Sequence, residues 1–395
     1  INPMAVTRRS LRSRSRGAPS HKPFPKTASP PNVLNTLTNL SPPSPFVVLL
    51  LMLLFEAFLG YVIVTRVGYT EIDWVAYMEE VSGYLSGERN YYNLRGGTGP
   101  LVYPALFLYI YSFLRRISGG DGGDVRVAQW VFVVVYLVNR VVVGFIYKRC
   151  LVDGRKGKEE EGGKWRFLMS MILLSLSKRI HSLYSLRLFN DCVNVLLLNL
   201  SILIFTSTLQ SKTIRNHLGS LLYSMSVGVK MNSLLYAPGV LLFYLQSTPL
   251  HSTIISLSIC ALTQLVIGYP FLTTHPIPYL RKAFELDRVF FYKWTVNLKF
   301  LPEETFVNKT FGLILLLGHV ACLIVVVRKF YVLSRKSRRS ISVRKLWNPN
   351  LTPSPEYTCC LLWSVNFVGI VFARTLHYQF YTWYFDSIPF LVMVG

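Results

Sequence analysis

Apolar residues are gathered along the chain in long continuous blocks separated by short polar stretches. The blocks lie at about 46–65, 101–115, 126–147, 167–179, 189–207, 217–229, 233–246, 252–272, 310–328, 357–373 and from 386 onward. Many approach the ~20 residues that a helix needs to cross a bilayer. A membrane β-barrel would instead show segments of alternating hydrophobicity. Because only helices and closed barrels satisfy the backbone inside lipid, the pattern predicts an all-α polytopic membrane protein.

Composition and charge narrow the class further. Of the 395 residues, 51% are hydrophobic and 15% are charged, whereas about 25% charged residues are usual in soluble domains. These values exclude a soluble enzyme, a disulfide-stapled secreted domain and a disordered tail protein. The formal net charge is +23, and two basic blocks without acids, 1–45 and 328–345, adjoin apolar blocks. Cytoplasmic loops carry such an excess of Lys and Arg, so we expect contact with the lipid bilayer and none with nucleic acid.

The chain is predicted to have two parts. Residues 1–45 are rich in Pro and basic residues and form a disordered basic arm in the cytosol. Residues 46–395 form a multispanning transmembrane domain. Because the chain ends inside an apolar run, we expect this domain to continue beyond the last residue.

The orientation of the blocks can be counted from both basic segments. Three polar stretches then share the side opposite the cytosol: 66–100, 187–191 and 273–309. The two counts differ by one crossing. Therefore either 101–115 or 167–179, both short blocks, does not span the membrane.

A polar stretch with carboxylates follows the first apolar block. From Trp74 the apolar residues recur at helical spacing, which predicts a short amphipathic helix on the membrane surface with Asp73 at its start. Asp frequently caps a helix N-terminus. The alternative is a carboxylate at the mouth of a membrane cavity that acts as a general base. The two interpretations are compatible, and both remain open.

Three further charged residues lie beside or between apolar blocks. Arg187 and Asp191 are four residues apart, a spacing that allows an ion pair on one helix face. Arg187 is alternatively a phosphate ligand, because its planar fork matches phosphate oxygens. A Lys at bilayer depth costs about 2.5–3.5 kcal/mol. Lys230 therefore has either an ion-pair partner or a functional role, unless it lies near the interface and extends its amine there.

Two aromatic-rich stretches carry the remaining candidates. The loop 273–309 interleaves aromatic residues with Arg, Lys and Asn, and includes Trp294 and Asn297. Such a mixture suits stacking on sugar rings, although an interfacial aromatic belt explains much of it. The second stretch begins at Arg374 and includes His377. An Arg and a His three residues apart at a membrane boundary are candidates for binding a phosphodiester.

Six stretches of the membrane part carry a family resemblance. In chain order they are YTEIDWVAYMEEV, GTGPLVYPA, RIHSLYSLRLFND, VKMNSLLYAPG, WTVNLKFLPE and LHYQFYTWYF. In this combination the chain resembles the dolichyl-phosphate-mannose-dependent α-1,3-mannosyltransferases of N-glycan precursor assembly, the Not56-like family. The resemblance implies a GT-C-type glycosyltransferase of the endoplasmic reticulum membrane, with a luminal site and with 46–395 as the catalytic domain.

The resemblance also implies a reaction and roles for residues. Mannose passes from dolichyl phosphate mannose to the five-mannose oligosaccharide on dolichyl diphosphate, in α-1,3 linkage and with inversion. An acid in the first luminal loop is the usual base of this class, and Asp73 matches that position. We expect the donor phosphate to contact Arg187, Lys230, Arg374 and His377. We expect the sugars to contact Glu71, Trp74, Asp191, Trp294, Asn297, Tyr378 and Gln379.

Some alternatives remain beside this expectation. No cofactor is expected, although Glu71, Asp73 and Asp191 could coordinate a metal ion. Another dolichyl-phosphate-sugar-dependent GT-C transferase would share most of these features. A secondary transporter predicts broken half-helices in two related halves of the chain, and the sequence has no visible symmetry of this kind.

Overall fold

The computed structural model describes residues 41–209, 211–284, 291–336 and 353–394. Contacts divide the chain into Ile1–Ser41 and Pro42–Gly395, and every element described below belongs to the second unit. The predicted basic arm covers residues 1–45, of which 1–40 lie outside the described residues.

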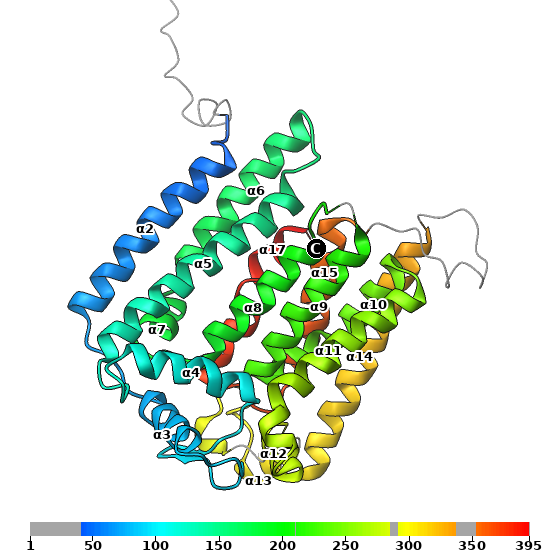
Figure 1. Ribbon diagram of the computed structural model, residues 1–395. Coiled ribbons are helices and arrows are strands. Elements are labelled where there is room, and N and C mark those ends of the chain that lie inside the picture. Colours follow the sequence, from blue (N-terminus) through cyan, green and yellow to red (C-terminus); the bar gives the residue numbers. More distant parts are fainter. Residues whose placement is uncertain (1–40, 210, 285–290, 337–352, 395) are drawn as a thin grey trace, which may run out of the picture. The chain divides into compact units, whose positions relative to one another are not determined.

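Helices make up nearly all of the regular structure in the described residues (Figure 1). The longer helices are α2 (Pro45–Arg66), α3 (Trp74–Leu85), α4 (Ala105–Ile117), α5 (Val125–Leu151), α6 (Lys158–Ser175), α8 (Asn190–Phe205), α9 (Lys212–Val229), α10 (Ala237–Ser247), α11 (Leu250–Leu272), α14 (Lys309–Lys336) and α15 (Pro355–Val371). The shorter α-helices are α7 (Lys178–Ser185), α12 (Pro276–Ala283), α13 (Glu303–Val307), α16 (Thr382–Phe385) and α17 (Ile388–Val394). Three 3-10 helices, η1 (Met231–Tyr236), η2 (Tyr292–Trp294) and η4 (Tyr378–Tyr381), and a two-stranded antiparallel ribbon, β1 (Arg95–Gly96) with β2 (Gly99–Pro100), complete the list.

Several described helices are suited to crossing a membrane. By length and composition alone, α2, α5, α11 and the Lys309–Leu333 part of α14 are long and apolar enough. The pair α7 and α8, bent by 108° at the break between them, adds a fifth span if the pair is counted as one. The prediction of an all-α polytopic membrane protein is therefore confirmed, and α3 begins at Trp74 as the apolar spacing predicted.

Block 101–115 forms a helix that is too short to span. Helix α4 has 13 residues and is about 20 Å long at 1.5 Å per residue, less than the ~30 Å of the hydrocarbon core. Its Tyr109 hydroxyl donates to the carbonyl of Ile267 near the end of α11 (2.7 Å), and its Tyr111 hydroxyl to that of Leu188 (3.0 Å). Helices α3 and α4 lie at the same end of the molecule as α12 and α13 (Figure 1), which we call the α3 end. Block 101–115 therefore does not span as α4. Helix α6, which holds most of block 167–179, is not among the helices long and apolar enough to cross either, so the choice between the two blocks stays a prediction.

Backbone contacts at the α3 end join stretches that are far apart in sequence. The amide of Thr70 donates to the carbonyl of Leu186 (3.1 Å), and the amide of Val296 to that of Leu376 (2.8 Å). The first bond joins the loops after α2 and α7, and the second joins the loops after α12 and α15. Figure 1 shows α3, α12 and α13 at this same end, as the prediction that 66–100 and 273–309 share one side requires.

A buried polar network anchors the segment between α16 and α17. Asp386 is 6% exposed and forms an ion pair with Arg140 of α5. It also accepts hydrogen bonds from the side-chain amides of Asn139 on α5 (3.1 Å) and Asn199 on α8 (2.9 Å). A charge inside a membrane protein is costly unless it is paired. The network therefore fixes where α16 lies against α5 and α8.

Candidate active site

Asp73 immediately precedes the first residue of α3, but its side chain does not cap the helix. Its φ of −126° and ψ of −7° differ from the extended conformation of most capping residues. Instead, Oε1 of Glu71 accepts a hydrogen bond from the amide of Val75 (3.1 Å). The half-buried Asp73 carboxylate accepts only a long bond, 3.4 Å, from the Tyr77 hydroxyl among the bonds described. The capping interpretation of Asp73 is therefore wrong, and its carboxylate is available for chemistry.

Lys230 is paired with Asp191 inside the protein. Its Nζ lies 2.8 Å from Oδ2 of Asp191, whose side chain is fully buried, and 3.3 Å from Oδ1 of Asn190. The indole N–H of Trp383 donates to the other oxygen of Asp191. The interpretation of Lys230 as an amine extending to the interface is therefore wrong, since Lys230 is 8% exposed. Asp191, expected to contact sugar, has both oxygens bonded within the protein.

The predicted ion pair between Arg187 and Asp191 does not form. Helix α7 ends at Ser185 and α8 begins at Asn190, so the two residues do not share a helix. Leu188 in the break has a positive φ of 51°, which few non-glycine residues adopt. Arg187 instead donates to the Ser182 hydroxyl.

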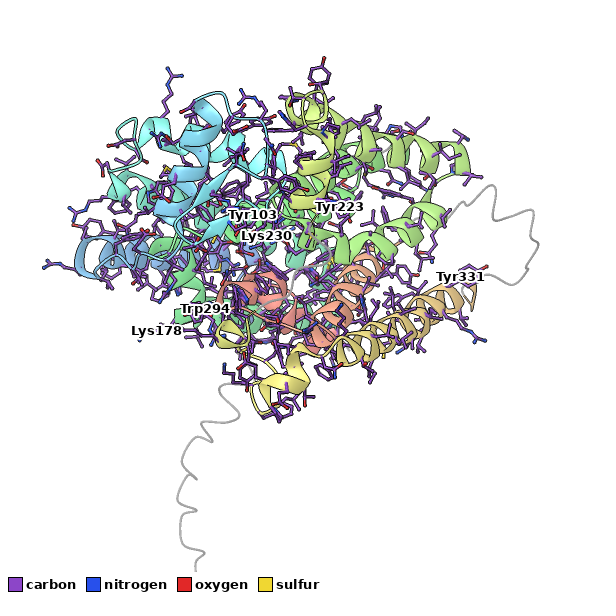
Figure 2. The ribbon with its side chains drawn as sticks, turned by 90° about the horizontal axis from the view of Figure 1, so that it is seen from below. Tyr103, Lys178, Tyr223, Lys230, Trp294 and Tyr331 are labelled. Atoms are coloured by element: carbon purple, nitrogen blue, oxygen red, sulfur yellow. The ribbon has the colours of Figure 1, made fainter. Side chains whose placement is uncertain are left out.

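Three carboxylates and one ammonium group surround Tyr103. Burial raises the pKa of the Tyr103 hydroxyl most, and the carboxylates of Asp73, Asp191 and Glu80 raise it further. The Nζ of Lys230 lies 5.3 Å from the centre of the Tyr103 ring, and the two labelled side chains are neighbours in Figure 2, which views the α3 end. Glu80 is 4% exposed, and burial followed by the charge of Asp73 raises its pKa well above the ordinary value. We call Asp73, Glu80, Tyr103, Asp191 and Lys230 the cluster, because their charges influence one another.

The cluster sets the proton affinity of Asp73. Burial is the largest effect and raises the pKa of its carboxyl above the ordinary value. The Lys230 ammonium lowers that pKa, the Asp191 carboxylate raises it, and the hydrogen bond from Tyr77 lowers it. A carboxylate with a raised pKa is a stronger base than a solvated one, and such perturbed groups concentrate at functional sites.

Two arginines lie over one tyrosine ring. The guanidinium carbon of Arg187 lies 5.1 Å from the centre of the Tyr378 ring, and that of Arg179 lies 4.7 Å from it. Arg179 also lies 5.0 Å from the centre of the Tyr381 ring. Arg179 is exposed, whereas Arg187 and Tyr378 are half-buried. The arrangement places two cations from the α7–α8 region against the C-terminal aromatic stretch.

The other two expected phosphate ligands occupy different surroundings. The ring of His377 stacks on Phe380 (5.0 Å between centres, 7° between planes), and Phe380 stacks on Trp383 (3.8 Å). This stack connects His377 to the indole that bonds Asp191. Arg374 instead donates through Nε to the carbonyl of Phe306 (2.9 Å) in α13 and packs over its ring. The structure thus places His377 near the cluster and uses Arg374 to hold α13.

Two residues that were expected to contact sugar, Trp74 and Asn297, form hydrogen bonds within the protein instead. Trp74 is 1% exposed and donates its indole N–H to the carbonyl of Gly122 (3.0 Å), so it is a packing residue and presents no face to a sugar. The side-chain amide of Asn297 donates to the carbonyl of Ala373 and accepts from the amide of Leu376, both at 2.7 Å. It therefore joins two loops and is not a free sugar ligand.

Three expected sugar contacts keep accessible surface. Trp294 is 59% exposed, and Glu71, besides capping α3, accepts a hydrogen bond from the Tyr69 hydroxyl (2.7 Å) and stays exposed. Gln379 is half-buried, and its carbonyl accepts from the Thr382 hydroxyl. Their roles in sugar binding stay predictions.

The sequence interpretation missed four residues of this region: Glu80, Tyr103, Arg179 and Trp383. Tyr103, Arg179 and Trp383 lie inside the stretches GTGPLVYPA, RIHSLYSLRLFND and LHYQFYTWYF, so the resemblance gave a signal for each. Glu80 lies inside the stretch YTEIDWVAYMEEV, so the resemblance gave a signal for it as well.

The described residues include no group of three His, Cys, Asp or Glu side chains close enough to hold a metal ion. Glu71, Asp73 and Asp191, the possible ligand set, are therefore not gathered in that way. Glu71 and Asp191 direct their oxygens to Val75, Tyr69, Lys230 and Trp383 instead.

Fold and site together define a class: a polytopic all-α membrane protein with an acid and several cations gathered at one end of its helices. Within that class the chain belongs to the ALG3 protein family, whose family model matches residues 50–395. The membrane part predicted from the sequence is thus covered almost entirely.

Individual relatives agree with this assignment. The Arabidopsis thaliana protein named Dol-P-Man:Man(5)GlcNAc(2)-PP-Dol alpha-1,3-mannosyltransferase is 41% identical over 360 residues, which cover 86% of this chain and 76% of the relative. The Neurospora crassa protein of the same name is 40% identical, covering 91% and 78% of the two chains. The Homo sapiens protein of that name is 39% identical, covering 86% and 74%. No solved structure matches the chain.

Proposed function

We propose that this protein transfers mannose from dolichyl phosphate mannose, in α-1,3 linkage, to the five-mannose oligosaccharide on dolichyl diphosphate. The observation that carries the proposal is the identity of 37–41% to relatives that are named for this reaction. The same names disfavour both the transporter and a transferase that uses another sugar.

The α3 end is the proposed location of the reaction, on the luminal side of the endoplasmic reticulum membrane. The basic segments at 1–45 and 328–345 are then cytosolic. The loops that meet at the α3 end lie on the opposite side, where the half-buried Asp73 carboxylate lies among the cations.

Asp73 is the proposed general base. The 3-hydroxyl of the acceptor mannose loses its proton to the Asp73 carboxylate while its oxygen attacks the anomeric carbon of the donor. The new C–O bond forms on the face opposite the phosphate, and the bond from the anomeric carbon to the phosphate oxygen breaks. Dolichyl phosphate leaves with that electron pair. One displacement of this kind inverts the anomeric configuration, as expected from the resemblance.

The cations are proposed to stabilise the leaving phosphate. Positioned positive groups aimed at developing charge are a major source of rate enhancement. Lys230 is the first candidate, because among the charged groups it acts most strongly on Asp73, and Arg187 and His377 are the further candidates. Arg374 contributes by holding the loop before His377, since it is bound to Phe306.

The test is a profile of lipid-linked oligosaccharides in cells that lack the protein. The proposal expects accumulation of the five-mannose species and its relief when this chain is expressed. Purified protein with both substrates should then yield a six-mannose product whose new linkage is α-1,3. Accumulation of any other intermediate, or a product with another linkage, contradicts the proposal.

A further inference from the structure

Arg179 and Arg187 form a pair of cations on a shared aromatic platform. Both guanidinium carbons lie within about 5 Å of the centre of the Tyr378 ring, so the two charges are at most about 10 Å apart, within a Debye length at 0.1 M salt. Arg179 comes from the first turn of α7 and Arg187 from the break before α8. Tyr378 is contributed by η4, nearly two hundred residues later in the chain.

No acidic side chain in the described part of the chain neutralises the pair. The ion pairs found there involve other residues, and Arg187 donates to the uncharged Ser182 hydroxyl. Like charges held at this spacing repel each other, and a bound anion relieves that repulsion. Both guanidinium groups lie over the Tyr378 ring at distances typical of a cation–π contact. Arg187 uses one N–H for the Ser182 hydroxyl, and the other N–H groups of the two side chains, one exposed and one half-buried, remain for a ligand.

The helix that carries Arg179 is held firmly. Two residues after Arg179, Nε2 of His181 lies 2.6 Å from Oε2 of Glu56 on α2, and Nδ1 lies 2.8 Å from the carbonyl of Ser177. At the other end of α7, the Gln129 side chain donates to the carbonyl of Ser185 (2.6 Å). Anchoring at both ends fixes the backbone that carries Arg179, which reduces the ordering that binding requires.

We propose that Arg179 and Arg187, supported by Tyr378, bind the phosphate of a polyprenyl-linked substrate. A guanidinium presents a planar fork that matches phosphate oxygens, and two forks suit one phosphate headgroup. Two substrates of the proposed function carry this chemistry, the phosphodiester-linked donor and the diphosphate-linked acceptor. The inference rests on that proposed function and adds Arg179 to its expected phosphate ligands, acting together with Arg187. Lys230 differs from these two arginines because it already forms an ion pair with Asp191.

The experiment compares purified wild type with Arg179→Gln, Arg187→Gln and the double variant, varying donor and acceptor concentrations separately. Each single variant should raise the KM of one substrate by about tenfold or more, with a much smaller change in kcat. A rise in the donor KM identifies the donor phosphate as the ligand, and a rise in the acceptor KM identifies the diphosphate. Because both arginines hold one headgroup, the double variant should lose less than the product of the two single losses.

Four further variants complete the design. Arg116→Gln removes an exposed arginine of α4 at the same end of the protein and should leave both KM values unchanged. Tyr378→Leu removes the platform and should raise the same KM as Arg179→Gln, whereas Tyr378→Phe keeps the ring and should raise that KM less than Tyr378→Leu does. If Arg179→Gln does not accumulate, Arg179→Lys keeps the charge without the fork and should raise that KM severalfold.

The inference is overturned if wild type transfers mannose as proposed while Arg179→Gln, or Arg179→Lys in its place, leaves both KM values unchanged. It is also overturned if the two single losses multiply in the double variant, since the arginines would then act on separate groups. Failure of the proposed function gives a different result, because wild type itself would not elongate the five-mannose acceptor.

Discussion

Replacing either partner of the ion pair between Lys230 and Asp191 should shift the pKa of Asp73, in opposite directions for the two partners. Lys230→Met removes the ammonium that lowers the pKa of Asp73, so that pKa should rise. Asp191→Asn removes a carboxylate that raises the same pKa and keeps an oxygen for the indole of Trp383, so the pKa should fall. Because the base must be deprotonated, activity is lost as the pH falls through the pKa of Asp73. The acidic limb of the profile should therefore move to higher pH in the first variant and to lower pH in the second.

The same pair predicts a loss of stability. The Asp191 side chain is fully buried, and its Oδ2 lies 2.8 Å from the Lys230 ammonium. Removing one partner of a buried ion pair costs about 3–5 kcal/mol, because the other charge stays buried without compensation. Lys230→Met should therefore unfold at a clearly lower temperature in detergent. Lys230→Met combined with Asp191→Asn should recover much of that loss, since no net charge is left behind.

The predicted displacement of the acidic limb is measured as kcat/KM of purified protein at a series of pH values, which reports the pKa of the base in the free enzyme. Lys309→Met, which removes an exposed lysine at the start of α14, serves as the control and should show no displacement. General damage to the fold lowers activity at every pH and does not move the limb in two directions. If both variants displace the limb the same way, or neither displaces it, the electrostatic account of Asp73 is refuted.

Two further predictions concern the scaffold around the site. Arg140→Met should destabilise the protein by about 3–5 kcal/mol, because it leaves Asp386 unpaired among buried residues. Adding Asp386→Asn should restore part of that stability, and equal melting temperatures of the single and double variants would contradict the role of the Arg140–Asp386 ion pair. At Gly96, a Cβ would come within 2.6 Å of Ala76 Cα, so Gly96→Ala should displace α3 and destabilise the protein by about 1–3 kcal/mol, measured by thermal unfolding. Gly97→Ala is the matched control, because its Cβ would meet nothing closer than 3.5 Å, and similar losses in both would argue against the close approach.

The hydrophobic pattern predicts the helices well because burial in lipid or protein demands continuous apolar runs. Helix α2 spans 45–66 against a predicted 46–65, and the amphipathic helix begins at Trp74 as expected. The pattern could not show where the helix in 101–115 packs. That depends on the hydroxyl contacts of Tyr109 and Tyr111 with residues far along the chain.

The site was less accessible to sequence reasoning, because its contacts are tertiary. Arg187 and Asp191 have the spacing of a helical ion pair, yet the chain breaks between them at Leu188 and Asp191 instead pairs with Lys230. Asp73 lies at a position where Asp often caps, yet its side chain makes no capping hydrogen bond and Glu71 caps the helix. Arg179 gave no signal by spacing, because its aromatic partner Tyr378 lies in a distant part of the chain.

The central claim is that Asp73 is the catalytic base, and its most direct test is mannosyl transfer by purified Asp73→Asn protein. A positioned base contributes about 10²–10⁴-fold to a rate. The account predicts a loss of kcat of at least this size, with wild-type expression and melting temperature and with little change in either KM. Near-normal transfer by well-folded Asp73→Asn protein would contradict it and would assign the proton to another group.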